Sequence, residues 1–178
     1  MEGLRDTDTY QCRLRCQLDG GAQSPYSRGF MRTLADPAVA ACLAARLRRV
    51  TPTQARVWGT MTPHQMLAHV AIAAEAAQGL RPFSGSKRKP SRLIKWIAIY
   101  GPFRWPHGVR AGAKPADAVL DPESFEAERS HAITALEALA APQGTVAEGH
   151  PLFGPMSRAD WLRWGFLHTD HHLRQFGL

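Results

Sequence analysis

Residues 161–176 read WLRWGFLHTDHHLRQF, and this stretch says more about the fold than any other part of the chain. On a helix of about 100° per residue, His168 and His172 lie one turn apart on the same face. Charged residues such as Arg163 and Asp170 fall on the opposite side. The pattern therefore predicts an amphipathic helix that directs two imidazoles toward its apolar side.

The spacing of His168 and His172 is also that of a metal-binding pair. Two imidazoles one turn apart can bind a single ion through nitrogens about 2 Å from it, whereas His171 is rotated away from the pair. The same spacing occurs in ordinary helices, where the histidines are core or surface residues, so the pair alone leaves both interpretations open. A third ligand from elsewhere in the chain would favour the metal site.

Length and composition predict one globular domain, because the chain has 178 residues of which 44% are hydrophobic. No apolar run approaches the roughly 18 residues of a membrane span, and residues 1–30 lack the apolar centre of a signal peptide. We therefore expect a cytoplasmic protein with no membrane partner. Residues 1–30 are polar and lack periodicity, so we expect a disordered N-terminal extension and place the folded domain at residues 31–178.

The net charge of +7 is concentrated in one segment, which holds nine basic residues and no acidic one. Such a segment can attract an anionic substrate, a thiol cofactor that bears carboxylates, or nucleic acid, or it can be a solvated loop. We do not expect nucleic acid, because neither a binding motif nor interleaved stacking aromatics accompany the charge. The nine residues are Arg81, Lys87, Arg88, Lys89, Arg92, Lys95, Arg104, Arg110 and Lys114.

Capping signals predict four long helices. Each begins at a residue whose side chain can accept a hydrogen bond from the first turn, and two of these starts form a capping box with a residue three positions later. A long irregular segment over residues 80–121, with a short helix at residues 93–100, separates the second helix from the third. We expect no strands, so the fold class is an all-α four-helix bundle. The expected N-caps are Asp36, Thr62, Asp121 and Ser157.

His69 lies on the apolar face of the second predicted helix. A single histidine there is more often a hydrogen-bonded core residue than a ligand. Small alanines on this helix allow close packing against a neighbour, however, so the imidazole could meet His168 and His172. We expect His64 and His131 to lie outside any such site.

Four segments together resemble a family of uncharacterised bacterial proteins in the DinB/YfiT-like metalloenzyme superfamily. They are WGTMT at residues 58–62, QMLAH at 65–69, HPLFG at 150–154 and HTDHHLRQFG at 168–177. The resemblance covers about residues 31–178. It implies a four-helix bundle of up-down-down-up order, with a long crossover between helices two and three, where residues 80–121 lie.

The resemblance also implies a divalent metal held by one histidine of the second helix and an HxxxH pair of the fourth. Carried over residue by residue, the ligands are His69, His168 and His172. The ion would be zinc or nickel in the first place, with iron or manganese as alternatives. Many relatives have HHRGQ where this chain has HHLRQ at residues 171–175, so any role of that basic residue is not carried over.

Three imidazoles on a divalent ion leave coordination positions open, which is typical of a catalytic site. We expect a metal-dependent enzyme, a thiol-dependent S-transferase that binds a low-molecular-weight thiol as thiolate and acts on a small, anionic substrate. A metal-dependent hydrolase is one alternative, although the sequence places no general base beside the three histidines. A non-catalytic metal- or ligand-binding stress protein is another. An exposed apolar face at residues 93–100 would favour a homodimer.

Overall fold

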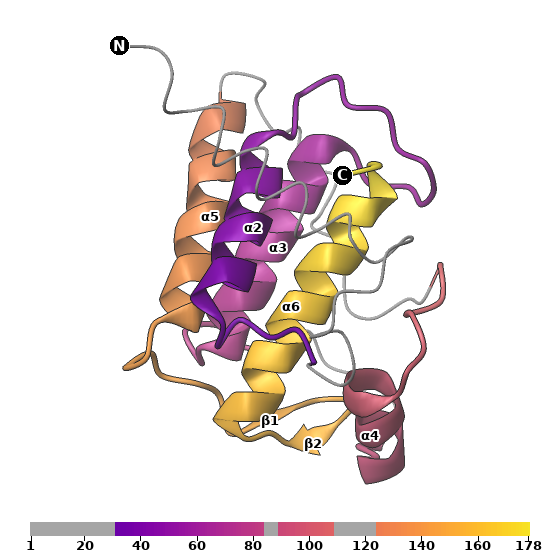
Figure 1. Cartoon of the computed structure of the whole chain (residues 1–178), viewed down its shortest axis with the longest axis vertical. Coiled ribbons are helices and arrows are strands. Elements are labelled where there is room, and N and C mark those ends of the chain that lie inside the picture. The colour runs from indigo at the N-terminus through magenta and orange to yellow at the C-terminus, as the bar shows by residue number, and fades with distance from the viewer. Residues whose placement is uncertain (1–30, 84–88, 109–123) are drawn as a thin grey trace, which may run out of the picture. The chain divides into compact units, whose positions relative to one another are not determined.

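The computed structural model describes residues 31–83, 89–108 and 124–178, and one compact unit runs from Thr33 to Leu178. The described residues are mostly helical, as an all-α fold requires (Figure 1). The predicted extension at residues 1–30 lies outside them. The helices are α2 (Pro37–Arg48), α3 (Pro63–Ala77), α4 (Arg92–Tyr100), α5 (Phe125–Ala140) and α6 (Arg158–Gln175), and the strands are β1 (Gly149–His150) and β2 (Gly154–Pro155).

Three of the four predicted N-caps are confirmed. The Asp36 side chain accepts a hydrogen bond from the backbone of Ala38, and Thr62 forms a capping box with Gln65. Ser157 forms the corresponding box with Asp160 at the start of α6. Side-chain caps satisfy amide groups that a helix start leaves unpaired, which is why these positions are readable from sequence. The fourth predicted cap, Asp121, lies outside the described residues, and α5 begins at Phe125.

Helix α3 packs between α5 and α6, and α2 contacts the same two helices. Side-chain contacts between α3 and α5 advance along both helices together, from Glu75 with His131 to Gln78 with Ala135, so these two helices run in the same direction. Helices α3 and α6 run in opposite directions (Figure 1). Large apolar residues fill the space enclosed by α2, α3, α5 and α6. They include Leu43, Leu47, Met66, Leu67, Leu136, Leu139, Trp161 and Leu173.

The expectation of no strands is wrong in one place. Residues 149–155 form a two-stranded antiparallel hairpin in which Gly149 pairs with Pro155 and His150 with Gly154. Each strand is only two residues long, too short to produce the alternating pattern by which strands are recognised in a sequence. The hairpin leads directly into the N-cap of α6.

The predicted short helix over residues 93–100 is confirmed as α4. Its Lys95 and Tyr100 side chains both bond to Asp160 at the start of α6, and this attaches the segment between α3 and α5 to the rest of the fold. Burial alone would raise the pKa of Asp160, but hydrogen bonds from Tyr100, Ser157 and Lys95 lower it to about 2. Parts of the segment, with Lys87, Arg88, Arg110 and Lys114, lie outside the described residues.

None of the described helices is both long enough and apolar enough to cross a membrane.

Candidate metal centre

His69 on α3 and His168 and His172 on α6 meet at the contact between the two helices. The Nε2 atoms of His69 and His168 lie 3.1 Å apart, and one nitrogen from each of the three rings lies within 4.8 Å of the others. The three ring centroids are 4.6 to 4.9 Å apart. The structure brings together the three histidines that the sequence singled out, and the cluster could hold a metal ion.

The spacing of the nitrogens is compatible with a shared ion, although the separation between His69 and His168 also fits a hydrogen bond. Two ligand nitrogens about 2.0 Å from a tetrahedral ion lie about 3.3 Å apart, close to the separation between His69 and His168. A separation of 4.8 Å, the limit within which all three nitrogens lie, would have to close by about 1.5 Å on metal binding. Direct hydrogen bonding alone would satisfy only one such pair of nitrogens at a time.

The environment of the cluster favours the neutral form of all three imidazoles. Burial lowers the pKa of His69 to about 4 and that of His172 to about 3. Burial also lowers the pKa of His168 well below its usual value, with further lowering from the neighbouring imidazoles. Because a metal binds only the unprotonated nitrogen, this environment keeps the three rings ready to act as ligands.

His172 is oriented by Gln175, one turn further along α6. His172 Nδ1 lies 3.2 Å from Gln175 Oε1, and since an amide oxygen only accepts, the ring proton sits on Nδ1 and Nε2 is left free. Gly59 makes room for this amide: a Cβ at Gly59, where φ is +86°, would lie 1.8 Å from Gln175 Nε2. Gly59 and Gln175 both lie in segments that carry the family resemblance, but the sequence did not predict their contact.

Aromatic rings surround the cluster, and sequence reasoning missed most of them. Trp164 stacks on His168 with ring centroids 4.6 Å apart, and the Trp105 ring lies 6.4 Å from it. Trp58 stacks on His107 at 4.1 Å and meets the edge of His171 at 4.7 Å. These rings come from three different segments, so no local pattern could have grouped them. Their effect is to keep water away from His168.

His171 lies closer to the site than predicted. It is not one of the three clustered ligands, in agreement with its helical position, but its ring is buried 5.3 Å from that of His172. Its Nδ1 is buried, with no hydrogen-bond partner among the described residues. Burial, together with the positive charge of Arg174, lowers its pKa to about 4.

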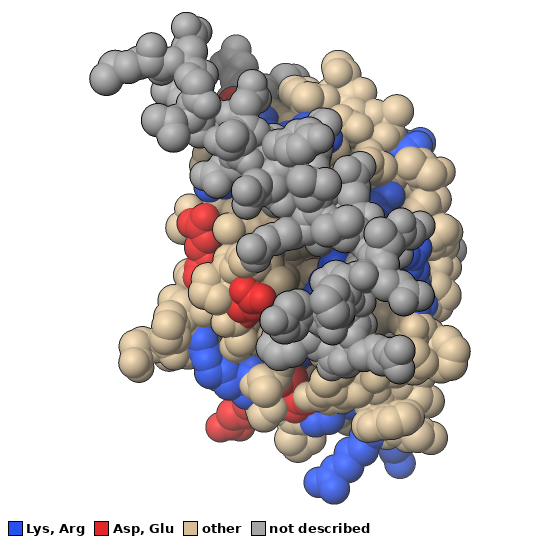
Figure 2. All heavy atoms as spheres, in the orientation of Figure 1, with Lys and Arg blue, Asp and Glu red and all other residues tan. Residues whose placement is uncertain are grey.

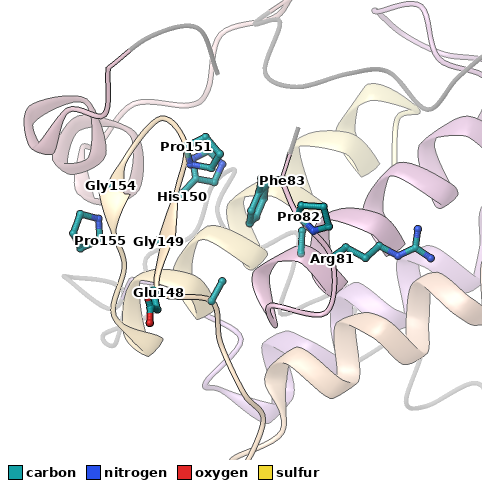
Figure 3. A pocket seen from close by; sticks show the side chains of 11 residues that line it. Arg81, Pro82, Phe83, Glu148, Gly149, His150, Pro151, Gly154 and Pro155 are labelled. Atoms are coloured by element: carbon teal, nitrogen blue, oxygen red, sulfur yellow. The ribbon is translucent and has the colours of Figure 1, made fainter. Parts of the chain in front are cut away.

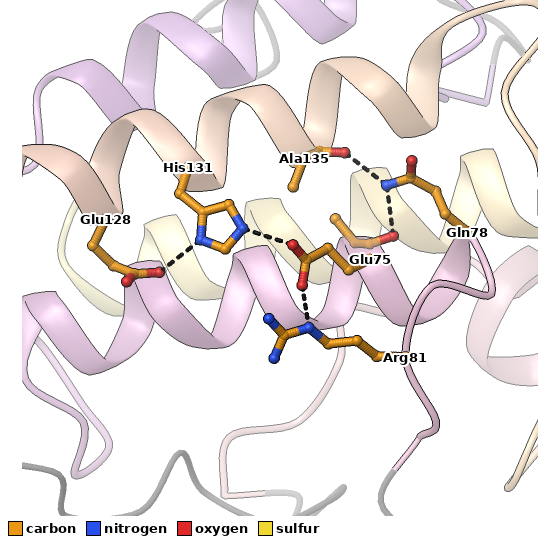
Figure 4. Close-up of polar contacts among 7 residues, drawn as sticks. Glu75, Gln78, Arg81, Glu128, His131 and Ala135 are labelled. Atoms are coloured by element: carbon orange, nitrogen blue, oxygen red, sulfur yellow. Dashed lines mark hydrogen bonds and ion pairs between the residues drawn. The ribbon is translucent and has the colours of Figure 1, made fainter.

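A second polar cluster lies where α3 meets α5, and it combines one histidine with carboxylates and an arginine (Figure 4). His131 of α5 bonds to Glu75 at 2.7 Å and to Glu128 at 3.3 Å. The hydrogen bond to Glu75 raises the pKa of His131, against the opposing effect of burial. Glu75 in turn pairs with Arg81 at 2.5 Å. His131 is therefore an ion-pair residue outside the site, as predicted, and His64 is also outside it, near Phe125.

A hollow of about 560 Å³ lies between residues 81–83 and the β1–β2 hairpin (Figure 3). Arg81 and Phe83 line one side and His150 the other. His150 Nδ1 accepts from the backbone N–H of Leu152, so its proton is on Nε2, and burial lowers its pKa to about 4. The Phe83 and His150 rings both contact Trp164, the tryptophan that stacks on His168. The Trp164 ring therefore lies between the lining of the hollow and the histidine cluster.

Residues 65–177, more than half of the chain, match the model of the protein family DUF1569. The chain belongs to this family. The description of DUF1569 is "Protein of unknown function", and the matched span contains all three clustered histidines together with Gln175. No curated protein and no solved structure matches the chain. Membership of DUF1569 therefore assigns the family without assigning an activity.

Proposed function

We propose that this DUF1569 protein binds a divalent metal ion through His69, His168 and His172 and uses it in a thiol-dependent transfer reaction. The observation that carries the proposal is the convergence of three imidazoles, one buried and two half-buried, whose pKa values are lowered, with no carboxylate or thiol in the cluster among the described residues. Such a ligand set leaves coordination positions open to a further ligand. Zinc or nickel suits imidazole ligands, and iron or manganese would suit them where supply favours those ions.

The chemistry that a divalent ion supplies at such a site is to lower the pKa of a coordinated thiol, so that it is held as thiolate. The chain contributes orientation and shielding. Gln175 holds the His172 ring with Nε2 toward the cluster, and Trp164 and Trp105 exclude water from His168. Exclusion of water strengthens electrostatic effects on a bound substrate and limits side reactions.

The hollow beside Trp164 would hold the remainder of the thiol or of its anionic substrate. Arg81 is one of the nine basic residues noted in the sequence. It lines the hollow, but its guanidinium points away from the hairpin and pairs with Glu75 (Figure 3). A guanidinium is well suited to a carboxylate, so an anionic ligand in the hollow would compete with Glu75 for Arg81. Lys95 is likewise paired, with Asp160, and the part of the basic segment that holds Lys87 and Arg88 lies outside the described residues.

The proposal includes a relationship to the DinB/YfiT-like superfamily, whose members are bundles of up-down-down-up order. The helix directions support it: α3 and α5 run one way, α2 and α6 run the other, and the long segment that contains α4 lies between α3 and α5 (Figure 1). The position of the histidines on α3 and α6 agrees with the ligand positions of that superfamily.

A hydrolase is less well supported, because metal-assisted hydrolysis needs a general base within reach of the site. The three carboxylates on the histidine helices are engaged elsewhere. Asp160 bonds to Lys95 and Tyr100. Glu75 pairs with His131 and Arg81, and Asp170 pairs with Arg46 and Arg174. A non-catalytic protein that binds metal or a stress ligand through the same site remains the second candidate, and the experiment below separates it from the transferase.

The experiment uses protein purified without a histidine tag. Elemental analysis first identifies the metal and its stoichiometry. The metal-loaded protein, the chelator-treated protein and His168→Ala are then assayed for conjugation of glutathione, cysteine or bacillithiol to monochlorobimane. We expect conjugation that requires both the metal and His168. Stoichiometric metal with no rate above that of His168→Ala would instead identify a metal-binding protein without transferase activity, and absence of metal would refute the site.

A further inference from the structure

Helix α4 presents an apolar face to solvent. Leu93 is 67% exposed and Trp96 is 61% exposed, and Ile94 and Ile97 are exposed beside them. Phe103, in the turn that follows, is 71% exposed. At 100° per residue the four helix residues cover a continuous arc of one side. So many large apolar side chains on nine residues and the next turn are unusual on a protein surface and indicate a contact surface.

The opposite face of α4 is firmly attached, so the exposed face has a fixed orientation. Ile99 is fully buried, and Lys95 and Tyr100 bond to Asp160 of α6. The backbone of Ile99 accepts a hydrogen bond from Arg163, and that of Ala98 accepts one from Trp105. Rotation of α4 to bury its apolar face would break these bonds. The apolar face is therefore a feature of the folded protein.

Positive charge surrounds the apolar face. Lys89 and Arg92 lie at its N-terminal side and Arg104 follows Phe103, and all three are exposed. Figure 2 shows lysine and arginine atoms at the end of the molecule where α4 lies, as well as at other places on this face. The sequence from residue 81 to residue 114 contains no aspartate or glutamate to balance them.

We propose that the outer face of α4, with Phe103, binds reversibly to an anionic lipid surface. Leucine, isoleucine, tryptophan and phenylalanine beside lysine and arginine is the composition of helices that lie in the headgroup region of a bilayer. A symmetric contact between two copies is less favourable, because it would bring the basic rim of one copy against that of the other. The proposal replaces the expectation of no membrane partner, which considered only membrane spans.

The test measures co-sedimentation of the full chain with vesicles of phosphatidylcholine alone, or of equal parts phosphatidylcholine and phosphatidylglycerol. One variant combines Leu93→Ser, Trp96→Ser and Ile97→Ser, and a second combines Arg92→Gln and Arg104→Gln. The matched control is Val57→Ser with Leu80→Ser, which removes exposed apolar side chains elsewhere on the chain. Circular dichroism and thermal unfolding establish that each variant is folded.

We expect binding to the anionic vesicles only. The charge variant should bind about tenfold more weakly, and salt at about 0.5 M should weaken wild-type binding in the same way. Binding should be absent in the apolar variant and unchanged in the control.

Three results would overturn the proposal. The first is failure of the wild type to bind the anionic vesicles, and the second is binding that the apolar variant retains. The third is self-association of the wild type in light scattering, without vesicle binding, that the apolar variant abolishes. This third result would identify a second copy of the chain as the occupant of the face. None of these results bears on the metal centre.

Discussion

Helix α3 contributes a side chain to each of two clusters, the three-histidine cluster facing α6 and the polar cluster of His131 facing α5. The two clusters differ in the groups that surround the imidazoles. His69 faces His168 and His172, where rings and backbone provide no negative charge. His131 of α5 faces Glu75 and Glu128. Burial without a carboxylate lowers the pKa, and a carboxylate raises it even where burial opposes the effect. The first cluster therefore has free nitrogens for a metal, and the second is an ion-pair network.

The largest effect expected from this comparison is on metal content. His69→Ala, His168→Ala and His172→Ala should each lose most of the bound metal, because two remaining imidazoles hold an ion far less tightly than three. His131→Ala and His64→Ala should keep it. Elemental analysis after reconstitution and desalting measures the difference. Metal close to one equivalent in His69→Ala would remove the three-histidine site.

The next effect is the response of the metal-free protein to acid. The folded-state pKa values of His69 and His172 lie below the usual 6.5, so protons bind preferentially to the unfolded chain. The free energy of unfolding should therefore fall as the pH drops below about 6.5, by up to about 1.4 kcal/mol per pH unit for each imidazole. Urea unfolding between pH 5 and pH 8 measures the slope. A variant with His69→Phe should show a shallower slope, and an equal slope would contradict the assignment.

A smaller effect is expected from the residue that orients His172. Gln175→Ala should weaken metal affinity by about tenfold, because outer partners of a metal-ligating histidine typically contribute that much. Gly59→Ala should act in the same direction by displacing the Gln175 amide. Gln54→Ala is the matched control, since its side-chain amide donates to the backbone of Phe176 and makes no contact with the histidine cluster among the described residues. Competition with a chromophoric chelator gives the affinities, and equal losses in Gln54→Ala and Gln175→Ala would show a general effect on packing.

The smallest effect is expected at the second cluster, and its pH dependence has the opposite sign. The folded-state pKa of His131 is raised, so its contribution to stability is complete below pH 6.5 and disappears as the pH rises through the raised value. His131 is partly exposed, so His131→Gln should lower the Tm by only about 2 °C at pH 6. The difference should vanish at pH 9. Differential scanning calorimetry tests this, and a difference that grew with pH would contradict a charged His131.

Local signals in the sequence determined much of the helical fold. Asp36, Thr62 and Ser157 begin helices because a capping side chain acts on amides two or three residues away, which a short stretch of sequence reveals. The face shared by His168 and His172 follows from helical geometry alone. The placement of His69 beside them needed the family resemblance as well, because a lone histidine on an apolar face is ambiguous.

Only the tertiary structure decided the surroundings of those histidines. Trp58, Trp105 and His107 come from loops, and their contacts with α6 depend on how the chain returns to it. The pairing of Glu75 with His131 likewise joins residues 56 positions apart. The direction of each pKa shift follows from these neighbours and from burial, since neither is a property of local sequence. The sequence thus predicted which imidazoles could meet, and the packing of α3 between α5 and α6 decided for which of them the pKa is lowered and for which it is raised.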